Sequence, residues 1–348
     1  MNPKPTRTTI KEVAAVAGVS TMTVSRVLND RPDVSLTTRM RIKRIIEELE
    51  YQPSAIARSL IQQKSYTLGV VTAGLEHIGP SRILNGITRA AEEAGYAILL
   101  KELSDSQVAN PTPIFQKLLS RHVDGIIWAV AEIGENHKWL ENSSLPLETP
   151  TVFLTTEPNK TQTTVLIDNY YGAQLAMAHL FEQGCRNIGH IAGPLDWWEA
   201  RQRMSAWKDF LIGHNMPVKD AYWVEGDWSS ASGIPAAAKL LTQYPEIDAI
   251  FVANDQMALS ALQVLHKRGI RIPAEIAIVG FDNIPESACF YPALTTIQQN
   301  QHELACVAVQ QMIQIIEQGW QGKDIGAPQS IVLLPTLIAR ESSIRQKS

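Results

Sequence analysis

The chain has 348 residues, of which 45% are hydrophobic and 19% charged, and its formal net charge is −4. These values are typical of soluble globular proteins, exclude a disordered or collagen-like chain, and leave room for two or three domains. No apolar run approaches the roughly 18 residues that a membrane-spanning helix requires. The N-terminal residues MNPKPTRTT lack the apolar segment of a signal peptide. We therefore expect a cytoplasmic protein with no membrane partner.

Cysteines and charges add two further constraints. Cys185, Cys289 and Cys306 are far apart and form no CxxC pair, which favours reduced thiols over a disulfide framework. The charge is unevenly distributed, because residues 1–65 contain eleven Lys or Arg and six Asp or Glu. This segment therefore carries +5 and the remainder −9. A basic head on an acidic body favours docking of one end on phosphate.

Residues 1–52 are predicted to form three short helices. Thr9 and Glu12 have the spacing of a capping box, which predicts a helix that begins at Ile10. Gly18 ends this helix, and Ser20 can cap a second helix over Thr21–Leu28. Ser35 is the expected cap of a third helix that reaches about Glu50, with apolar residues along one stripe.

A helix, a glycine-containing turn and a second helix form a helix-turn-helix, whose second helix can enter the major groove of DNA. Thr21, Met22 and Arg26 are placed to reach base edges, and Arg26 can make a bidentate contact to guanine. Phosphate contacts are expected from Thr9, Ser20, Ser25 and Asn29. The alternative from this pattern alone is a plain three-helix bundle at the end of an enzyme.

From Tyr66 onward, apolar runs alternate with amphipathic helices in two series. The first series contains the runs TLGVV, AILL, GIIWAV and TVFL, with helices expected near Ser81–Ala94, Ile114–Arg121 and His137–Asn142. The second contains IGHIAG, WVEGD, AIFVAND and IAIVGFD, with helices near Gly172–Gln183, Ala200–Gly213, Ser230–Leu241 and Gln256–Arg268. Continuous apolar strands between helices predict an α/β core of two doubly wound parallel-sheet lobes. Ligands of such folds bind at the carboxyl ends of strands.

Several polar or aromatic residues follow these predicted strands. Asn254 and Asp255 follow AIFVA, Asp282 follows IAIVGF, and Trp228 follows WVEGD, while Arg203 lies in the helix after IGHIAG. Charged and amide groups can bind adjacent sugar hydroxyls in pairs, and tryptophan packs against the C–H face of a sugar ring. The set favours a sugar site, although each residue alone fits a helix cap or a turn equally well.

Four stretches of the sequence resemble the LacI/GalR family of bacterial transcriptional regulators. They are TIKEVAAVAGVSTMTVSRVLN in the head and GDWSSASG, VANDQMALSA and VGFDNIPESACFYPALTTIQQ in the core. The resemblance runs from about Thr8 to Arg340. It implies a sequence-specific DNA-binding repressor with a periplasmic-binding-protein-like core, released from operator DNA by a sugar or glycoside.

The resemblance also implies a domain organisation. Residues 1–52 would be the DNA-binding head, 53–65 a hinge helix and linker, and 66–348 the effector-binding and dimerisation core. Within the core, the N-terminal lobe would comprise about 66–165 and 299–328, and the C-terminal lobe about 166–298 and 329–345. The hinge would lie at Ser54–Leu60, which is too short to be a stable helix alone. In the family, paired hinge helices insert a leucine into the minor groove; here Ala57 would form the helix contact and Leu60 the wedge.

By position, the resemblance assigns the effector contacts to Gly79, Pro80, Ile83, Glu199, Arg203, Trp228, Asn254, Asp282 and Gln299. Three positions depart from the pattern, because Thr155 stands where an aspartate is expected, Glu199 where a serine is, and Gln301 where a phenylalanine is. Trp197 and Trp198 are additional aromatic residues, which favour a larger or different glycoside than a galactoside. We interpret Trp128, within GIIWAV, as a core residue.

Two other functions remain open at this stage. A purine or nucleotide effector is possible, since some family members use one, and its site would also stack an aromatic residue. A carbohydrate-active enzyme could pair Glu225, Asp255 or Asp282 as catalytic carboxylates. However, the sequence contains no Walker A, GxSxG or HExxH motif, and its histidines lack metal-ligand spacing. We expect no enzymatic activity, no cofactor and no metal.

The assembly expected from the resemblance is a homodimer, because operator half-sites about one helical turn apart require a two-fold axis. The family's tetrameric members add a C-terminal heptad repeat. This chain ends at RQKS without one, so a dimer is expected rather than a tetramer. Release of DNA by the effector rests on the resemblance alone, since linkage permits either sign.

Overall fold

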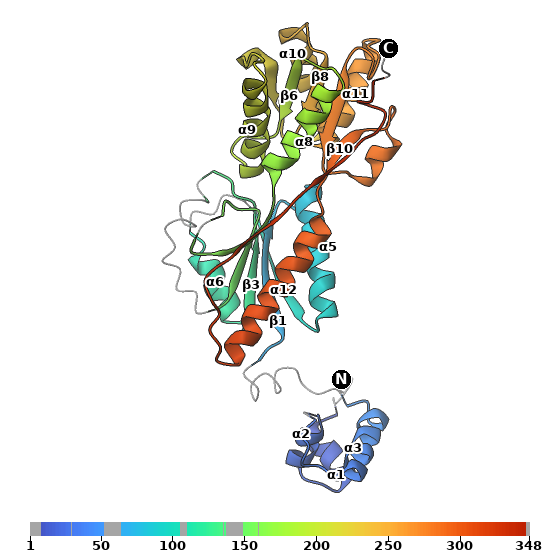
Figure 1. Cartoon of the computed structure of the whole chain (residues 1–348). Coiled ribbons are helices and arrows are strands. Elements are labelled where there is room, and N and C mark those ends of the chain that lie inside the picture. Colours follow the sequence, from blue (N-terminus) through green and yellow to red (C-terminus); the bar gives the residue numbers. More distant parts are fainter. Residues whose placement is uncertain are drawn as a thin grey trace. The chain divides into compact units, whose positions relative to one another are not determined.

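The computed structural model describes residues 8–28, 30–51, 64–104, 110–134, 136, 149–158 and 160–345. The chain forms two compact units, Met1–Tyr66 and Thr67–Ser348 (Figure 1). The boundary between them lies one residue from the start that we predicted for the core. The predicted helix at His137–Asn142 and the predicted hinge at Ser54–Leu60 lie outside the described residues.

The first unit contains three helices, α1 (Ile10–Ala17), α2 (Thr21–Leu28) and α3 (Leu36–Glu48). The predicted capping box is present, since Thr9 caps the backbone of Glu12 while the Glu12 side chain accepts from the Thr9 amide. Gly18 ends α1 with φ +62°, a conformation that glycine adopts without strain. The three helices share one small core of buried aliphatic side chains: Val13, Ala14, Ala17, Val24, Val27, Ile42 and Ile45. The predicted helix-turn-helix is therefore confirmed.

The N-terminal lobe of the second unit is a six-stranded parallel sheet in the order β2-β1-β3-β4-β5-β11. Its strands are β1 (Thr67–Ala73), β2 (Ala97–Leu103), β3 (Gly125–Ala129), β4 (Thr151–Leu154), β5 (Thr163–Ile167) and β11 (Ser330–Leu333). The helices are α5 (Ile78–Glu93), α6 (Thr112–Leu119) and α12 (Gln301–Trp320). One apolar cluster packs α5 and α12 on the sheet and a second packs α6, so both faces are covered.

The C-terminal lobe repeats this design, with the strand order β7-β6-β8-β9-β10-β12. Its strands are β6 (Ile188–Ala192), β7 (Trp223–Glu225), β8 (Ala249–Val252), β9 (Ala277–Phe281), β10 (Thr295–Gln298) and β12 (Thr336–Ile338), of which β12 is antiparallel. The helices are α8 (Asn169–Glu182), α9 (Trp198–Gly213), α10 (Ser230–Gln243) and α11 (Asp255–Lys267), with 3₁₀ turns η1 (Asp220–Tyr222) and η2 (Pro285–Cys289). Two apolar clusters again cover the two faces. The predicted pair of doubly wound lobes is confirmed.

The chain crosses between the lobes three times, after β5, β10 and β11 (Figure 1). The last crossing corrects our lobe boundary. We assigned residues from 329 onward to the C-terminal lobe, but Ser330–Leu333 pairs in parallel with β5 and extends the N-terminal sheet. The short apolar run SIVL adds a strand before the chain crosses to β12. The first boundary also lies later than predicted, because β5 continues to Ile167.

Five helices begin earlier than we expected, and two of them, α5 and α9, bear directly on the predicted effector contacts. Helix α5 starts at Ile78 rather than Ser81, since a proline in the first helical turn needs no hydrogen-bond partner for its nitrogen. Helix α9 starts at Trp198 rather than Ala200. As a result, Gly79, Pro80 and Glu199 all lie in first helical turns, where the backbone N–H groups of Gly79 and Glu199 have no partner within the helix.

The core interpretation of Trp128 is confirmed, because this side chain is 1% exposed and stacks on Phe115 at a centroid distance of 5.4 Å. Replacing Trp128 with alanine should reduce the free energy of unfolding by about 3–5 kcal/mol, because a large buried side chain would leave a cavity. Urea unfolding measures this change. Leu100→Ala, at an exposed position on strand β2 of the same sheet, serves as the control and should change stability by less than about 0.5 kcal/mol. Similar effects of both variants would contradict the assignment.

Candidate functional site

A single cavity in the core unit collects side chains that follow the strands of both lobes. Its empty volume is about 850 Å³, open mouth included. Both sheets have the order 2-1-3-4-5 over their first five strands, and the cavity lies at the carboxyl ends, where such folds bind ligands. All nine residues to which we assigned effector contacts line it: Gly79, Pro80, Ile83, Glu199, Arg203, Trp228, Asn254, Asp282 and Gln299.

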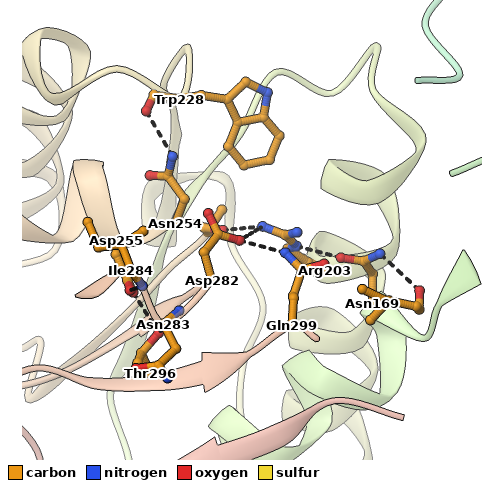
Figure 2. A network of polar contacts seen from close by, with 12 residues as sticks. Asn169, Arg203, Trp228, Asn254, Asp255, Asp282, Asn283, Ile284, Thr296 and Gln299 are labelled. Carbon is orange, nitrogen blue, oxygen red and sulfur yellow. Dashed lines mark hydrogen bonds and ion pairs between the residues drawn. The ribbon is translucent and has the colours of Figure 1, made fainter. Parts of the chain in front are cut away.

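Arg203 is the centre of a polar network on the C-terminal side of the cavity (Figure 2). This side chain is 4% exposed. Its Nε donates to Asn169 Oδ1 at 2.9 Å, and its Nη1 donates to the carbonyl oxygen of Ala253. Nη1 also lies 3.9 Å from Asp282 Oδ1. The guanidinium stacks over the Phe281 ring at 3.8 Å, so its charge is both balanced and fixed in orientation.

Asp282 reaches into the cavity from the end of β9, with φ +109°. Gln299 donates to its Oδ1 at 2.5 Å from the neighbouring strand end. Burial raises the pKa of the Asp282 carboxyl above its ordinary value, while the Arg203 charge opposes this shift. The positive φ costs backbone energy, which must be offset by the surrounding contacts.

Asp255, the first residue of α11, holds the loop that carries Asp282. Its Oδ2 accepts from the Ile284 amide at 2.9 Å, and its Oδ1 accepts from the Thr296 hydroxyl at 2.6 Å. Burial, reinforced by the nearby Asp282 charge, raises the pKa of Asp255 to about 8. This residue does not line the cavity, so it acts by positioning its neighbour.

Aromatic rings form another part of the lining. The carbonyl oxygen of Trp228 accepts from Asn254 Nδ2 at 2.8 Å, which fixes the backbone beside the indole (Figure 2). A Cβ at Gly193 would lie 2.2 Å from this indole, so only glycine leaves room for it. Trp197 packs edge-on against Trp228 at 5.9 Å and against His77 at 5.6 Å. The two tryptophans that we noted as additional, Trp197 and Trp198, both line the cavity.

Four buried polar atoms of the lining have no hydrogen-bond partner: Trp198 Nε1, Glu199 Oε2, Trp228 Nε1 and Gln301 Oε1. A buried polar atom without a partner is costly and therefore calls for an explanation. Here two are donors and two are acceptors. Burial also raises the pKa of Glu199 to about 7, with a smaller increase from the nearby Glu132. These atoms are available to a hydroxyl-bearing ligand.

Asn169 was missed by the sequence analysis although it lines the cavity and bonds Arg203. It follows the strand-forming run VLID, so the same strand-end pattern that selected Asn254 could have found it. His77 was also missed, and nothing in the sequence distinguishes it from a surface histidine. Thr155 and Gln301, which we noted only as departures, line the cavity too.

The head presents three of its predicted DNA contacts on the exposed side of α2. Thr21, Met22 and Arg26 are exposed, and Met22 keeps 64% of its surface in solvent. Arg26 forms an ion pair with Asp33 at 3.2 Å. Ser20 Oγ caps the amide of Thr23 at 3.2 Å.

Only some of the other residues predicted to contact DNA lie in the described part of the chain. Thr9 is exposed and caps α1, and Ser25 is half-buried. Asn29, Ala57 and Leu60 lie outside the described residues. The contacts of all these residues with DNA stay predictions.

Three other observations concern the enzyme alternative, metal binding and membrane-spanning helices. Of the three carboxylates considered for a glycosidase, Asp282 lines the cavity, whereas Glu225 and Asp255 do not; Glu225 accepts from the Leu195 amide instead. Within the described ranges, no three His, Cys, Asp or Glu side chains are grouped as metal ligands would be. No helix of the described part of the chain is long and apolar enough to span a membrane.

The two units match two separate protein families. Residues 9–54 match the bacterial regulatory proteins of the lacI family, and residues 177–343 match the periplasmic binding protein-like domain. A helix-turn-helix head joined to a small-molecule-binding core of this kind defines the class of ligand-responsive transcriptional regulators.

Relatives narrow the class to one family. The lactose operon repressor of Escherichia coli (strain K12) is 31% identical over 338 residues, covering 95% of this chain and 91% of the relative. The ribose operon repressor of the same strain is 32% identical, covering 96% and 99%. A crystal structure of the lac repressor dimer bound to operator and the anti-inducer ONPF superposes with a TM-score of 0.86 at 30% identity, covering 97% of this chain and 100% of that one. The chain therefore belongs to the lacI family of bacterial regulatory proteins and is a transcriptional regulator.

The raised pKa of Asp255 has a consequence for stability. Between about pH 4 and pH 8 the folded chain keeps a proton on this carboxyl that the unfolded chain has released, so stability falls as pH rises through this window. Asp255→Asn should remove this contribution and give a shallower decline between pH 5.5 and pH 8. Urea unfolding followed by tryptophan fluorescence measures this decline in stability, because all eight tryptophans of the sequence lie after residue 66. Parallel declines in both proteins would show that Asp255 is ionised throughout.

Proposed function

We propose that this chain is a repressor that binds operator DNA as a homodimer in the cytoplasm and is released when a sugar or glycoside enters the cavity. The observation that carries the proposal is the convergence of all nine expected effector residues on one cavity. The proposal assigns the chain no enzymatic activity. The relatives include the lactose and ribose operon repressors, whose names point to sugar-related operons.

The chemistry of the lining supports a sugar. Arg203 offers a planar fork of donors and Asp282 offers acceptor oxygens, and the two can bind neighbouring hydroxyls of one ring. Trp197 and Trp228 provide the aromatic surface against which the C–H face of a ring packs. The opposite wall is apolar, with Pro80, Ile83 and Leu304 from the N-terminal lobe. Such a site suits a sugar ring with an apolar substituent.

The switch would operate by linkage between two binding events. The sugar contacts both lobes and favours one arrangement of them, whereas operator DNA favours the other. A 100- to 1,000-fold loss of operator affinity requires a coupling of about 3–4 kcal/mol. Three crossovers join the lobes, so a change at the cavity can alter the relative placement of the two sheets.

Selection from random DNA should return a near-palindrome with a central CG step, as the dimer and the predicted Leu60 wedge require.

The DNA-binding face is tested by comparing two exposed arginines of the head that each pair with a carboxylate. Arg26→Ala should weaken binding to the selected operator roughly 5- to 150-fold, because a bidentate base contact contributes about 1–3 kcal/mol. Arg44→Ala, which removes an arginine paired with Glu48 on α3, is the matched control and should have a much smaller effect. Fluorescence anisotropy with operator and scrambled DNA measures both. Equal losses on the operator would contradict a base contact by Arg26.

The effector site is tested through Arg203. A screen of mono- and disaccharides by thermal shift identifies a binding sugar, and Arg203→Ala should then lower its affinity about 10- to 150-fold, because charged hydrogen bonds contribute about 1.5–3 kcal/mol. Arg203→Lys keeps the charge but loses the fork, so it should also respond poorly. Operator affinity without sugar should be retained.

Circular dichroism verifies that each of these variants is folded, and Arg271→Ala, in an exposed pair with Glu275, is the control. A folded Arg203→Ala protein that still releases operator at the wild-type sugar concentration would show that the effector binds elsewhere.

A further inference from the structure

We propose that Glu199 is the specificity-determining residue of the cavity: its free carboxylate oxygen accepts from a hydroxyl of a neutral saccharide and excludes anionic effectors such as sugar phosphates and nucleotides. This inference rests on the proposed sugar site and narrows the class of ligand. It concerns a position where the resemblance led us to expect a serine.

The first observation is the position and state of the Glu199 side chain. Glu199 is the second residue of α9 and lines the cavity one helical turn before Arg203. Its Oε2 is buried and has no hydrogen-bond partner. A buried carboxylate oxygen has two lone-pair positions to satisfy, and the cavity is the space from which a partner can come.

The second observation is that the two arginines that act on Glu199 already have partners. Arg203 bonds Asn169 and Ala253 and pairs with Asp282. Arg201, on the same helix turn, pairs with the buried Glu132 at 3.0 Å and donates to the Asp196 carbonyl oxygen at 2.8 Å.

Among the lining residues, the other basic side chain is His77, which lies 3.8 Å from Glu76. The cavity lining therefore offers an unsatisfied carboxylate oxygen, and each basic side chain of the lining has a carboxylate or amide partner. Arg82, whose charge lowers the pKa of Asp282, lines the adjoining pocket instead.

A neutral saccharide fits this arrangement and a phosphate does not. A hydroxyl both donates and accepts, and the lining leaves unpartnered acceptors at Glu199 and Gln301 and unpartnered donors at Trp198 and Trp228. A fully ionised phosphate group only accepts, so such a group placed beside Glu199 would leave the carboxylate unsatisfied and add a like charge in a poorly solvated site. Selectivity here would arise from repulsion of the wrong ligand as well as attraction of the right one.

Titration of Glu199 provides an independent signature. Its pKa of about 7 results mainly from burial, while a hydrogen bond from its own backbone amide, Arg203 and Arg201 lower the pKa and Glu132 raises it. Asp282 and His77 also line the cavity. A hydroxyl that donates to the carboxylate favours its ionised form, so saccharide affinity should fall as pH drops below 7. The expected loss is about tenfold between pH 8 and pH 6.

The experiment is calorimetric titration of the full-length protein with neutral mono- and disaccharides and with the 6-phosphates of the hexoses among them. The variants are Glu199→Gln, which keeps the shape and removes the charge, and Glu246→Gln, at an exposed glutamate of the same lobe, as the control. The wild type and the control should bind a neutral saccharide at least 100-fold more tightly than its phosphate, with the expected pH dependence. Glu199→Gln should lower the ratio of saccharide to phosphate affinity at least tenfold. It should also make saccharide affinity nearly independent of pH between pH 6 and pH 8.

Each outcome decides the proposal. Equal or tighter binding of the phosphate by the wild type overturns it. A Glu199→Gln protein that keeps both the selectivity and the pH profile also overturns it, because the pH dependence would then come from another group. If a neutral saccharide binds and Arg203→Ala abolishes that binding, the proposed sugar site stands even when the Glu199 result is negative. If no saccharide of either kind binds, the sugar site itself is wrong.

Discussion

The buried guanidinium of Arg203 is the constraint on which the rest of the site depends. A charge in a dry environment is tolerated only when its hydrogen bonds and a counter-charge are supplied together. Here the partners come from three separate places: the start of α8, the residue after β8 and the end of β9. Each partner lies in a segment that follows a strand, so the burial of one side chain fixes the relative positions of three strand ends.

The same constraint determines how the site can change. Arg203, Asp282 and Gln299 satisfy one another in the structure, so a ligand that binds them must replace protein hydrogen bonds with its own. The net gain from such an exchange is modest for each bond. The tryptophan rings and the unpartnered atoms of the lining have no competing partners and would contribute more to affinity. The network would then orient the ligand, while the aromatic wall and Glu199 would hold it.

Much of this organisation could be predicted from the sequence, and the failures have physical causes. The capping box at Thr9 and the alternation of apolar strands with helices depend on local spacing, which a sequence displays directly. Asp255 and Asp282 were both selected as strand-end carboxylates, but one supports a loop and the other faces the cavity. That difference depends on which way the chain turns after each strand, and the positive φ of Asp282 is set by contacts from β10 and α11.

The segment after α12 contributes a strand to each sheet in turn, β11 to one and β12 to the other. The last part of the chain therefore belongs to both lobes, because it supplies one edge strand to each sheet. Neither lobe corresponds to a continuous stretch of gene, and a truncation near residue 329 would remove an edge strand from both at once. The two compact units of the chain meet near residue 66. A fusion or a truncation is therefore safer at this junction than anywhere within the core unit.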